Sequence, residues 1–91
     1  MAGEVTDNPA MSRYEMDVDG TTAFVQYRLG DDAIALLHTE VPSELSGRGI
    51  GSALAKAVLD AVRQRGLKVV PHCEFIANYV ERRPEYRDLL L

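Results

Sequence analysis

Three glycines at alternate positions, Gly47, Gly49 and Gly51, are the residues whose type and spacing best suit chemistry. A strand is expected before them and a helix after them, so the first N–H groups of that helix are free to bind an anion. Glycines leave room for a diphosphate to approach the backbone, and Arg48 adds a positive charge. A turn alone needs fewer glycines. The spacing therefore indicates a diphosphate site over residues 46–52.

Two well-known phosphate motifs fit this loop poorly. The P-loop needs a Lys followed by Ser or Thr after its last glycine, and neither follows Gly51. The dinucleotide fingerprint needs a glycine where Ser52 stands and an acidic residue at the end of the next strand, which is also missing. The loop belongs to some other class of phosphate site.

Cys73 is the second residue of chemical interest, because it follows a short strand and stands where a helix is expected to begin. A helix N-terminus stabilises a thiolate. The alternative is that this cysteine is a small buried hydrophobe. His38 lies in an expected strand, where it serves either as a base or as a hydrogen-bonded sheet residue, and alternation places it on the same side as Leu36.

The elements that must position these residues follow from hydrophobic periodicity. Alternating residues predict strands over 13–18, 23–28 and 33–41, joined by turns at Asp19-Gly20 and Gly30. The third strand is apolar on both faces over 33–37, which predicts a layer on each side of it. An apolar stripe from Ile50 to Val62 predicts a helix that Gly66 ends. A strand over 67–70 and a helix over 73–82 follow, so the order is β-β-β-α-β-α.

Length and composition place these elements in one α+β domain over residues 13–91, after a flexible N-terminal tail over 1–12. The chain has 91 residues, 46% of them apolar, and a net charge of −4. An acidic chain lacks the basic surface that nucleic acids require. A single cysteine excludes an intrachain disulfide and a Cys-based zinc cluster, and no metal site is expected. The absence of a long apolar run and of a secretory signal predicts a cytoplasmic protein without a membrane partner.

Charge is unevenly distributed along the chain. Residues 1–45 carry nine acidic and two basic side chains, a net charge of −7, while residues 46–91 carry a net charge of +3. An uneven distribution of charge along the sequence is common in small proteins. Together with the glycine loop, however, it favours a second half that faces an anion.

The loop resembles the acyl-CoA pyrophosphate loop of the GCN5-related N-acetyltransferases (GNAT). In that pattern Gln or Arg is followed after two residues by Gly, and after one further residue by Gly or Ala. These positions correspond here to Ser46, Gly49 and Gly51, and Ser46 departs from the pattern. The runs 37–42, 67–73 and 83–86 match, in order, a small subfamily that lacks the first helices of the superfamily. The resemblance covers about residues 20–90, and Arg83 stands where that subfamily commonly has His.

The resemblance implies a truncated GNAT-like fold, in which an antiparallel meander meets a parallel strand that splays away at the CoA cleft. It implies that acetyl-CoA is the cosubstrate and that the acetyl group passes to an unidentified amine. Cys73 is then a nucleophile or an acid, and His38 a base; Glu40, His72 and Tyr86 are further candidates for proton transfer. The expected CoA-binding residues are Glu40, Val41, Ser46, Gly47, Arg48, Gly49, Ile50, Gly51, Ser52 and Asn78.

Two other functions remain open from the sequence. One is a CoA or acyl-CoA binding module without turnover, because a short chain forms only part of the usual binding site for the acetyl acceptor. The other is a small protein-interaction domain whose glycine loop contacts a partner. The chain is expected to be a monomer or a weak dimer in each case.

Overall fold

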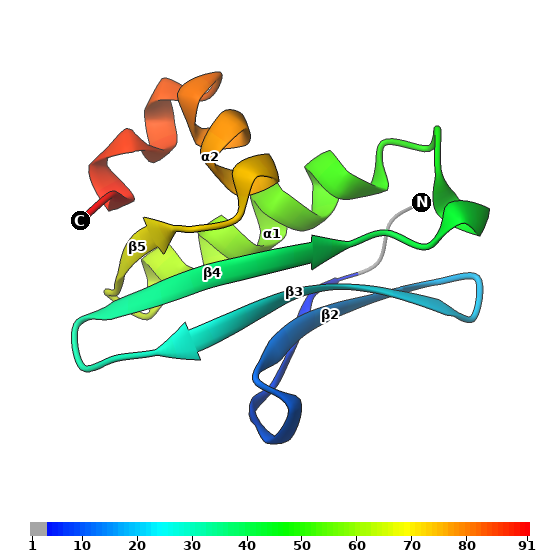
Figure 1. Ribbon diagram of the computed structural model, residues 1–91, viewed down its shortest axis with the longest axis horizontal. Helices are drawn as coiled ribbons and strands as arrows, with labels where there is room; N and C mark the ends of the chain where they lie inside the picture. Colours follow the sequence, from blue (N-terminus) through cyan, green and yellow to red (C-terminus); the bar gives the residue numbers. More distant parts are fainter. Residues whose placement is uncertain (1–3) are drawn as a thin grey trace.

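The computed structural model describes residues 4–91, which form one mixed sheet with two helices (Figure 1). The strands are β1 (Thr6–Asn8), β2 (Arg13–Val18), β3 (Thr21–Leu29), β4 (Ala33–Glu40) and β5 (Lys68–Pro71). Helix α1 spans Ile50–Gln64 and α2 spans Glu74–Glu81, and 3-10 turns cover Pro9–Met11, Ser43–Leu45 and Pro84–Leu89.

The strands lie side by side in chain order, β1-β2-β3-β4-β5. Neighbouring strands from β1 to β4 are antiparallel, and β5 runs parallel to β4 because α1 connects the two (Figure 1). Asp19 and Gly20 form the turn between β2 and β3 with φ angles of 52° and 81°. The structure confirms the α+β fold, the predicted meander and the predicted parallel strand.

The first strand corrects the expected tail over residues 1–12. Thr6–Asn8 pairs antiparallel with the start of β2, opposite Arg13 and Glu15. The Tyr27 hydroxyl donates a hydrogen bond of 2.6 Å to Oδ1 of Asp7, which ties this strand to the middle of the sheet. These contacts involve residues distant in sequence, so local periodicity does not reveal them. Residues 1–3 of the expected tail lie outside the described residues.

The hydrophobic core lies between one face of the sheet and the helices. Helix α1 buries Ile50, Leu54, Ala55, Val58, Leu59 and Val62. The helix is thus turned slightly from the predicted stripe, because Ala55 and Leu59 are buried while the alanines at 53, 57 and 61 are only half-buried. From the sheet, Val25, Ile34 and Leu36 are fully enclosed.

The expected layers on both faces of the third strand are not present in the described residues. Ile34 and Leu36 of β4 are buried beneath the helices, but Leu37 is 37% exposed. Ala33 and Ala35, on the other face, are half-buried. The helices pack on one face only, and we call the other the open face. Alanine side chains are small, so Ala33 and Ala35 can be half-buried on the open face without a second layer over them.

A β-bulge at Leu37 changes the side-chain alternation within β4. Tyr27 pairs with Leu36 and Gln26 pairs with His38, so Leu37 is an extra residue on β4. Directly paired residues share a face of the sheet. His38 therefore lies with Gln26 on the open face, whereas Leu36 is on the helix face. The prediction that His38 faces the same side as Leu36 is wrong, because the bulge inserts one residue between them.

Strand β4 continues past the point where β5 leaves it. The pairing between the two strands ends at Leu36 and Pro71, and the Cys73 N–H then donates to the Leu36 carbonyl at 2.8 Å. Residues 37–40 of β4 thus have a strand neighbour only on the β3 side. The peptide groups on their other edge face the opening at which α2 begins.

Candidate functional site

The glycine loop links β4 to α1 through two left-handed residues. Gly47 and Gly49 have φ angles of 77° and 72°, and Gly49 is the N-cap of α1. An L-residue in this conformation costs about 1–2 kcal/mol, so both glycines are needed for the backbone path. The first i to i−4 bond of α1 runs from Ala53 to Gly49 at 3.1 Å. The preceding N–H groups at 50–52 have no carbonyl of α1 to bind.

Gly51 also has a packing role, besides the expected one in CoA binding. A Cβ atom placed there would lie 2.9 Å from Cζ of Phe75. This glycine therefore lets the Phe75 ring of α2 lie against the first turn of α1. Phe75 is itself 42% exposed, unlike the helix residues Ile76 and Val80 beside it, which are buried. Phe75 thus lies at the edge of the core and not within it.

A hollow of about 300 Å³ lies over this loop. It brings together seven of the residues expected to bind CoA, and adds Leu45 and Phe75: Val41, Leu45, Ser46, Gly47, Gly49, Ile50, Gly51, Ser52 and Phe75. The lining combines glycine backbone, the start of a helix and apolar side chains. These features fit a diphosphate joined to a less polar arm.

Two of the expected CoA-binding residues, one inside the hollow and one outside it, have partners within the protein. Ser46 donates its hydroxyl to the Ser43 carbonyl at 2.8 Å, which stabilises the turn before the loop. Arg48 does not line the hollow; its guanidinium lies 3.0 Å from Asp19 in the β2–β3 turn. This ion pair connects the hairpin to the glycine loop, and both side chains are largely exposed.

Glu40 and His38 form a pair on the open face of the sheet. His38 Nε2 lies 2.9 Å from Glu40 Oε1, and the two side chains are 58% and 51% exposed. Phe24 packs edge-on to the imidazole, with 6.4 Å between ring centroids. Neither side chain lines the hollow over the glycine loop. The sheet therefore separates them from Cys73.

Cys73 contacts Thr39, a residue that sequence reasoning missed. The thiol Sγ lies 3.2 Å from Thr39 Oγ1, and either atom can donate the hydrogen bond. Cys73 is the N-cap of α2, as the sequence predicts, but it is only 8% exposed. Thr39 pairs with Val25, which places it on the helix face. Without the bulge, alternation would have put Thr39 on the open face, so the sequence carries no local signal for this contact.

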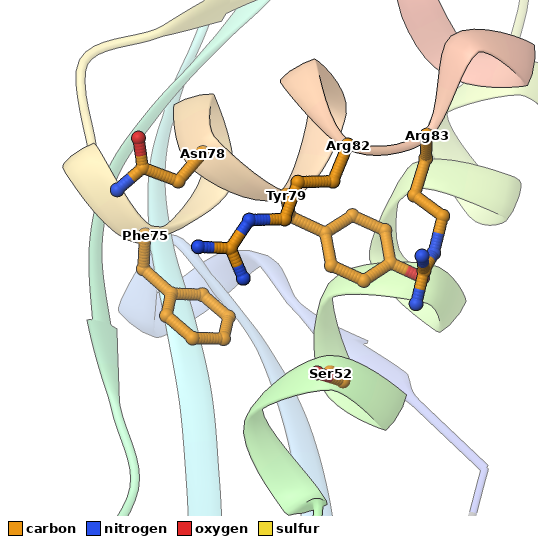
Figure 2. Close-up of a pocket in the computed structure, with 6 residues that line it drawn as sticks. All are labelled: Ser52, Phe75, Asn78, Tyr79, Arg82 and Arg83. Carbon is orange, nitrogen blue, oxygen red and sulfur yellow. The ribbon is translucent and has the colours of Figure 1, made fainter.

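A second hollow adjoins the first along α2. Its volume is about 230 Å³, and Figure 2 shows its lining residues: Ser52, Phe75, Asn78, Tyr79, Arg82 and Arg83. Asn78, expected to bind CoA, is exposed here rather than beside Cys73. Ser52 and Phe75 line both hollows, so the two form one trough that crosses the start of α1.

The remaining candidates for proton transfer have positions outside this trough. His72 is exposed, and its N–H donates to the Val70 carbonyl at 3.1 Å. Tyr86 anchors the C-terminal turn, because its hydroxyl donates a 2.7 Å hydrogen bond to Oδ1 of Asp60 on α1. Burial and the Asp60 carboxylate raise the pKa of Tyr86. Lys56 also binds Asp60, at 2.9 Å.

Among residues 4–91 no group of three or more potential metal ligands comes together. None of the helices in that range has the length and apolar character required to cross a membrane.

Comparison with known proteins identifies the family of this fold and site. Residues 13–89 match the GCN5-related N-acetyl-transferase family, and the chain belongs to it. It is similar in structure to a GCN5-like protein from Staphylococcus aureus solved by NMR. That likeness has a TM-score of 0.71 and 31% identity, and covers 97% of this chain and 87% of the other.

Curated relatives include Protein NATD1 of several vertebrates. The human protein is 45% identical over 56 residues, which are 62% of this chain and 50% of that protein. The Xenopus tropicalis protein is 43% identical over 56 residues, again 62% of this chain and 51% of that protein. The match thus spans about half the length of these relatives.

Proposed function

We propose that this protein binds acetyl-CoA in the trough and transfers the acetyl group to an amine. The observation that carries the proposal is the hollow over the glycine loop, in a chain that belongs to the GCN5-related N-acetyltransferase family. Members of this family generally use acetyl-CoA. The backbone N–H groups at 50–52 would bind the pyrophosphate, and Val41 and Leu45 would contact the pantetheine arm.

The thioester would then lie near the opening between β4 and β5. An oxyanion forms on the thioester carbonyl when an amine attacks, and preorganised N–H donors stabilise it. The free edge of residues 37–40 and the next residue, Val41, offers such donors. The reaction breaks the carbon–sulfur bond and forms a carbon–nitrogen bond. The amine must lose a proton, and the departing CoA thiolate must gain one.

Cys73 is the group we assign to the thioester end of the trough. Its thiol lies beside Thr39, on the helix face and next to the free edge of β4. It could protonate the CoA thiolate, or accept the acetyl group first and pass it on. His38 and Glu40 lie on the opposite face, so they could serve only an amine that approaches from that side.

One observation favours a second function, CoA binding without turnover. Cys73 is 8% exposed, and the two groups suited to act as a base are on the other side of the sheet. A protein with this arrangement could hold acyl-CoA while lacking a complete set of catalytic residues. Release of free CoA in the presence of amines distinguishes the two functions.

The experiment on the glycine loop uses Ser52→Glu. A substitution at Gly49 itself is avoided, because a side chain there would strain the left-handed backbone. Ser52 is exposed in the first turn of α1, where a carboxylate stabilises the helix by about 0.3–1 kcal/mol. The same carboxylate repels a diphosphate. We expect CoA affinity, measured by calorimetry, to fall at least about tenfold while thermal stability is retained. Gln64→Glu adds the same charge at the other end of α1 and should leave affinity unchanged. Equal affinity in both variants would overturn the assignment.

The experiment on Cys73 uses Cys73→Ala. If the thiol takes part in transfer, this variant should bind CoA normally and release little CoA from acetyl-CoA and an amine. Mass spectrometry after incubation with acetyl-CoA alone separates the two roles, because only a nucleophile retains an acetyl group. Full activity of Cys73→Ala would place the residue in the core and not in the reaction.

A further inference from the structure

A hollow of about 430 Å³ lies at the end of α1 opposite the glycine loop. It is lined by residues of β1, β2 and the last turn of α1, with one residue just before β1: Val5, Asp7, Tyr14, Ala61, Gln64 and Arg65. None of these residues lines either hollow of the trough. A volume of this size is typical of sites for small molecules. Acetyl transfer in the trough gives this hollow no role.

The buried hydroxyl of Tyr14 reaches this hollow with an unused proton. Tyr14 is 2% exposed, and its hydroxyl accepts a 2.7 Å hydrogen bond from Nη1 of Arg65. Because both residues line the hollow, the hydroxyl is the part of Tyr14 that borders it. The O–H itself donates to no acceptor within residues 4–91. Burial of a donor without an acceptor costs free energy, which a ligand that accepts this proton would recover.

Arg65 and Gln64 add further unused donors. Nη1 of Arg65 is 3.5 Å from Oδ2 of Asp7, a long contact, and its Nε and Nη2 form no hydrogen bond with any of residues 4–91. Gln64 is exposed beside them, and its amide makes no hydrogen bond in the same range. Asp7 already accepts a 2.6 Å hydrogen bond from the Tyr27 hydroxyl through Oδ1. The unused polar groups of the hollow are therefore mainly donors, gathered around one guanidinium.

We propose that this hollow binds a small monocarboxylate with a short aliphatic chain. The unused N–H groups of Arg65 match the two oxygens of a carboxylate, and the Tyr14 O–H supplies a further donor. Val5 and Ala61, both half-buried, offer apolar contact for the chain. Asp7, 3.5 Å from the guanidinium, favours a ligand with a single negative charge over a phosphate dianion.

The bound carboxylate would connect the start of the sheet to the end of α1. Asp7 belongs to β1 and Tyr14 to β2, whereas Arg65 directly follows α1. A ligand that binds only the folded protein raises its stability. Carboxylate binding should therefore raise the midpoint of thermal unfolding as well as occupy the hollow.

The experiment titrates hexanoate, hexanamide and hexylamine into isotope-labelled protein and follows the backbone amide shifts by NMR. The three probes share one chain length and differ in the charge of the head group. For a ligand of this size we expect a Kd for hexanoate of about 1–10 mM. Hexanamide should bind at least about tenfold more weakly, because its hydrogen bonds lack charge assistance, and hexylamine more weakly still. The shifts should centre on the amides of Tyr14, Ala61 and Arg65, not on those of the glycine loop.

Two variants test the donors. Tyr14→Phe keeps the buried ring and removes the hydroxyl, so hexanoate affinity should fall about fivefold. Gln64 is exposed, so Gln64→Glu retains the fold, and its carboxylate should lower hexanoate affinity at least about tenfold. Gln26→Glu is the matched control, since Gln26 is exposed on the open face and the substitution changes the net charge equally. It should leave hexanoate affinity unchanged.

Several outcomes would overturn the carboxylate site. They are a lack of hexanoate binding, equal affinity for hexanoate and hexanamide, and equal hexanoate affinity in Gln64→Glu and wild-type protein. Shifts confined to the glycine loop would place the probe in the trough and would overturn it too. None of these outcomes bears on the proposed function, because CoA affinity is measured separately and Gln64→Glu should leave it unchanged.

Discussion

Thr39 Oγ1 and Cys73 Sγ lie 3.2 Å apart, although 34 positions separate the two residues in the chain. The contact joins the free edge of β4 to the first turn of α2, at the point where β5 has left the sheet. It gives the single cysteine of the protein a polar neighbour within an otherwise apolar core. The hydroxyl is thus the group best placed to influence the reactivity of this thiol.

We expect Thr39→Val to slow alkylation of Cys73 by iodoacetamide at fixed pH. Valine keeps the shape of threonine but cannot donate a hydrogen bond to a thiolate. A hydrogen bond to a charged acceptor contributes about 1.5–3 kcal/mol, so the rate should fall about tenfold or more. Thr39→Ser, which keeps the hydroxyl, should restore most of the rate. A faster rate in Thr39→Val would mean that the hydroxyl shields the thiol instead.

Gly51→Ala should change stability and ligand binding in opposite directions. Alanine is a better helix former than glycine, so the free energy of unfolding should hold steady or rise by about 0.5 kcal/mol. The new Cβ would meet the Phe75 ring at 2.9 Å, and this exposed ring must swing away. CoA affinity should therefore fall. In a Phe75→Leu background the alanine should have little further effect, which a double-mutant cycle measures.

Asp19→Asn should increase CoA affinity. The Asp19 carboxylate lies 3.0 Å from Arg48, and its neutralisation frees this guanidinium for the phosphates. Asparagine tolerates the left-handed φ of 52° at this position. An exposed pair contributes little to stability, so we expect a change within about 0.5 kcal/mol. Removal of one nearby charge should tighten binding roughly fivefold.

Asp17→Asn is the control for this prediction. Asp17 accepts a hydrogen bond from Thr22, which an asparagine oxygen can also accept, and it has no ion pair in the described residues, so its neutralisation changes the net charge without releasing an arginine. An equal gain in both variants would point to a general charge effect and not to Arg48.

Stability should fall at alkaline pH through Tyr27. Burial, together with the hydrogen bond to Asp7, raises the pKa of this phenol from its ordinary value of 10.0 to about 12. A group with a raised pKa in the folded state contributes stability that is complete below pH 10 and is lost as pH rises toward 12. Urea unfolding at several pH values should show this loss. Tyr27→Phe should flatten the loss and cost about 1 kcal/mol at pH 8.

Local sequence signals predicted the helices more closely than the sheet edges. The stripe that starts at Ile50 and the glycine at 66 gave the bounds of α1, because helix caps and periodicity are encoded within a few residues. Gly66, with φ of 71°, has the left-handed conformation that its position predicts. By contrast β1 is only three residues long and, besides its pairing with β2, is held by contacts of Asp7 with Tyr27 and Arg65. Nothing within the first twelve residues specifies those partners.

The sequence predicted only that part of the candidate site whose residues are close together in the chain. The residues of the glycine loop are contiguous in sequence, and seven of the expected residues line one hollow. The sequence could not place Arg82 and Arg83 beside Ser52, since that depends on how α2 packs on α1. The expectation that His38 shares a face with Leu36 failed because of a single residue, Leu37. Strand alternation extrapolated across a bulge assigns every later side chain to the wrong face.

Because Leu37 is an extra residue, different alternate positions of β4 face the helices before it and after it. Before it, the even-numbered side chains, Ile34 and Leu36, face the helices; after it, the odd-numbered Thr39 does so. Charged substitutions along β4 should therefore lower stability at even positions before Leu37 and at odd positions after it. Deletion of Leu37 would remove the bulge, because His38 would then follow Leu36 directly and the side chains would alternate regularly along the whole strand. His38 would stay on the open face and Thr39 on the helix face beside the thiol, so each face would keep its chemistry while the strand loses its extra residue.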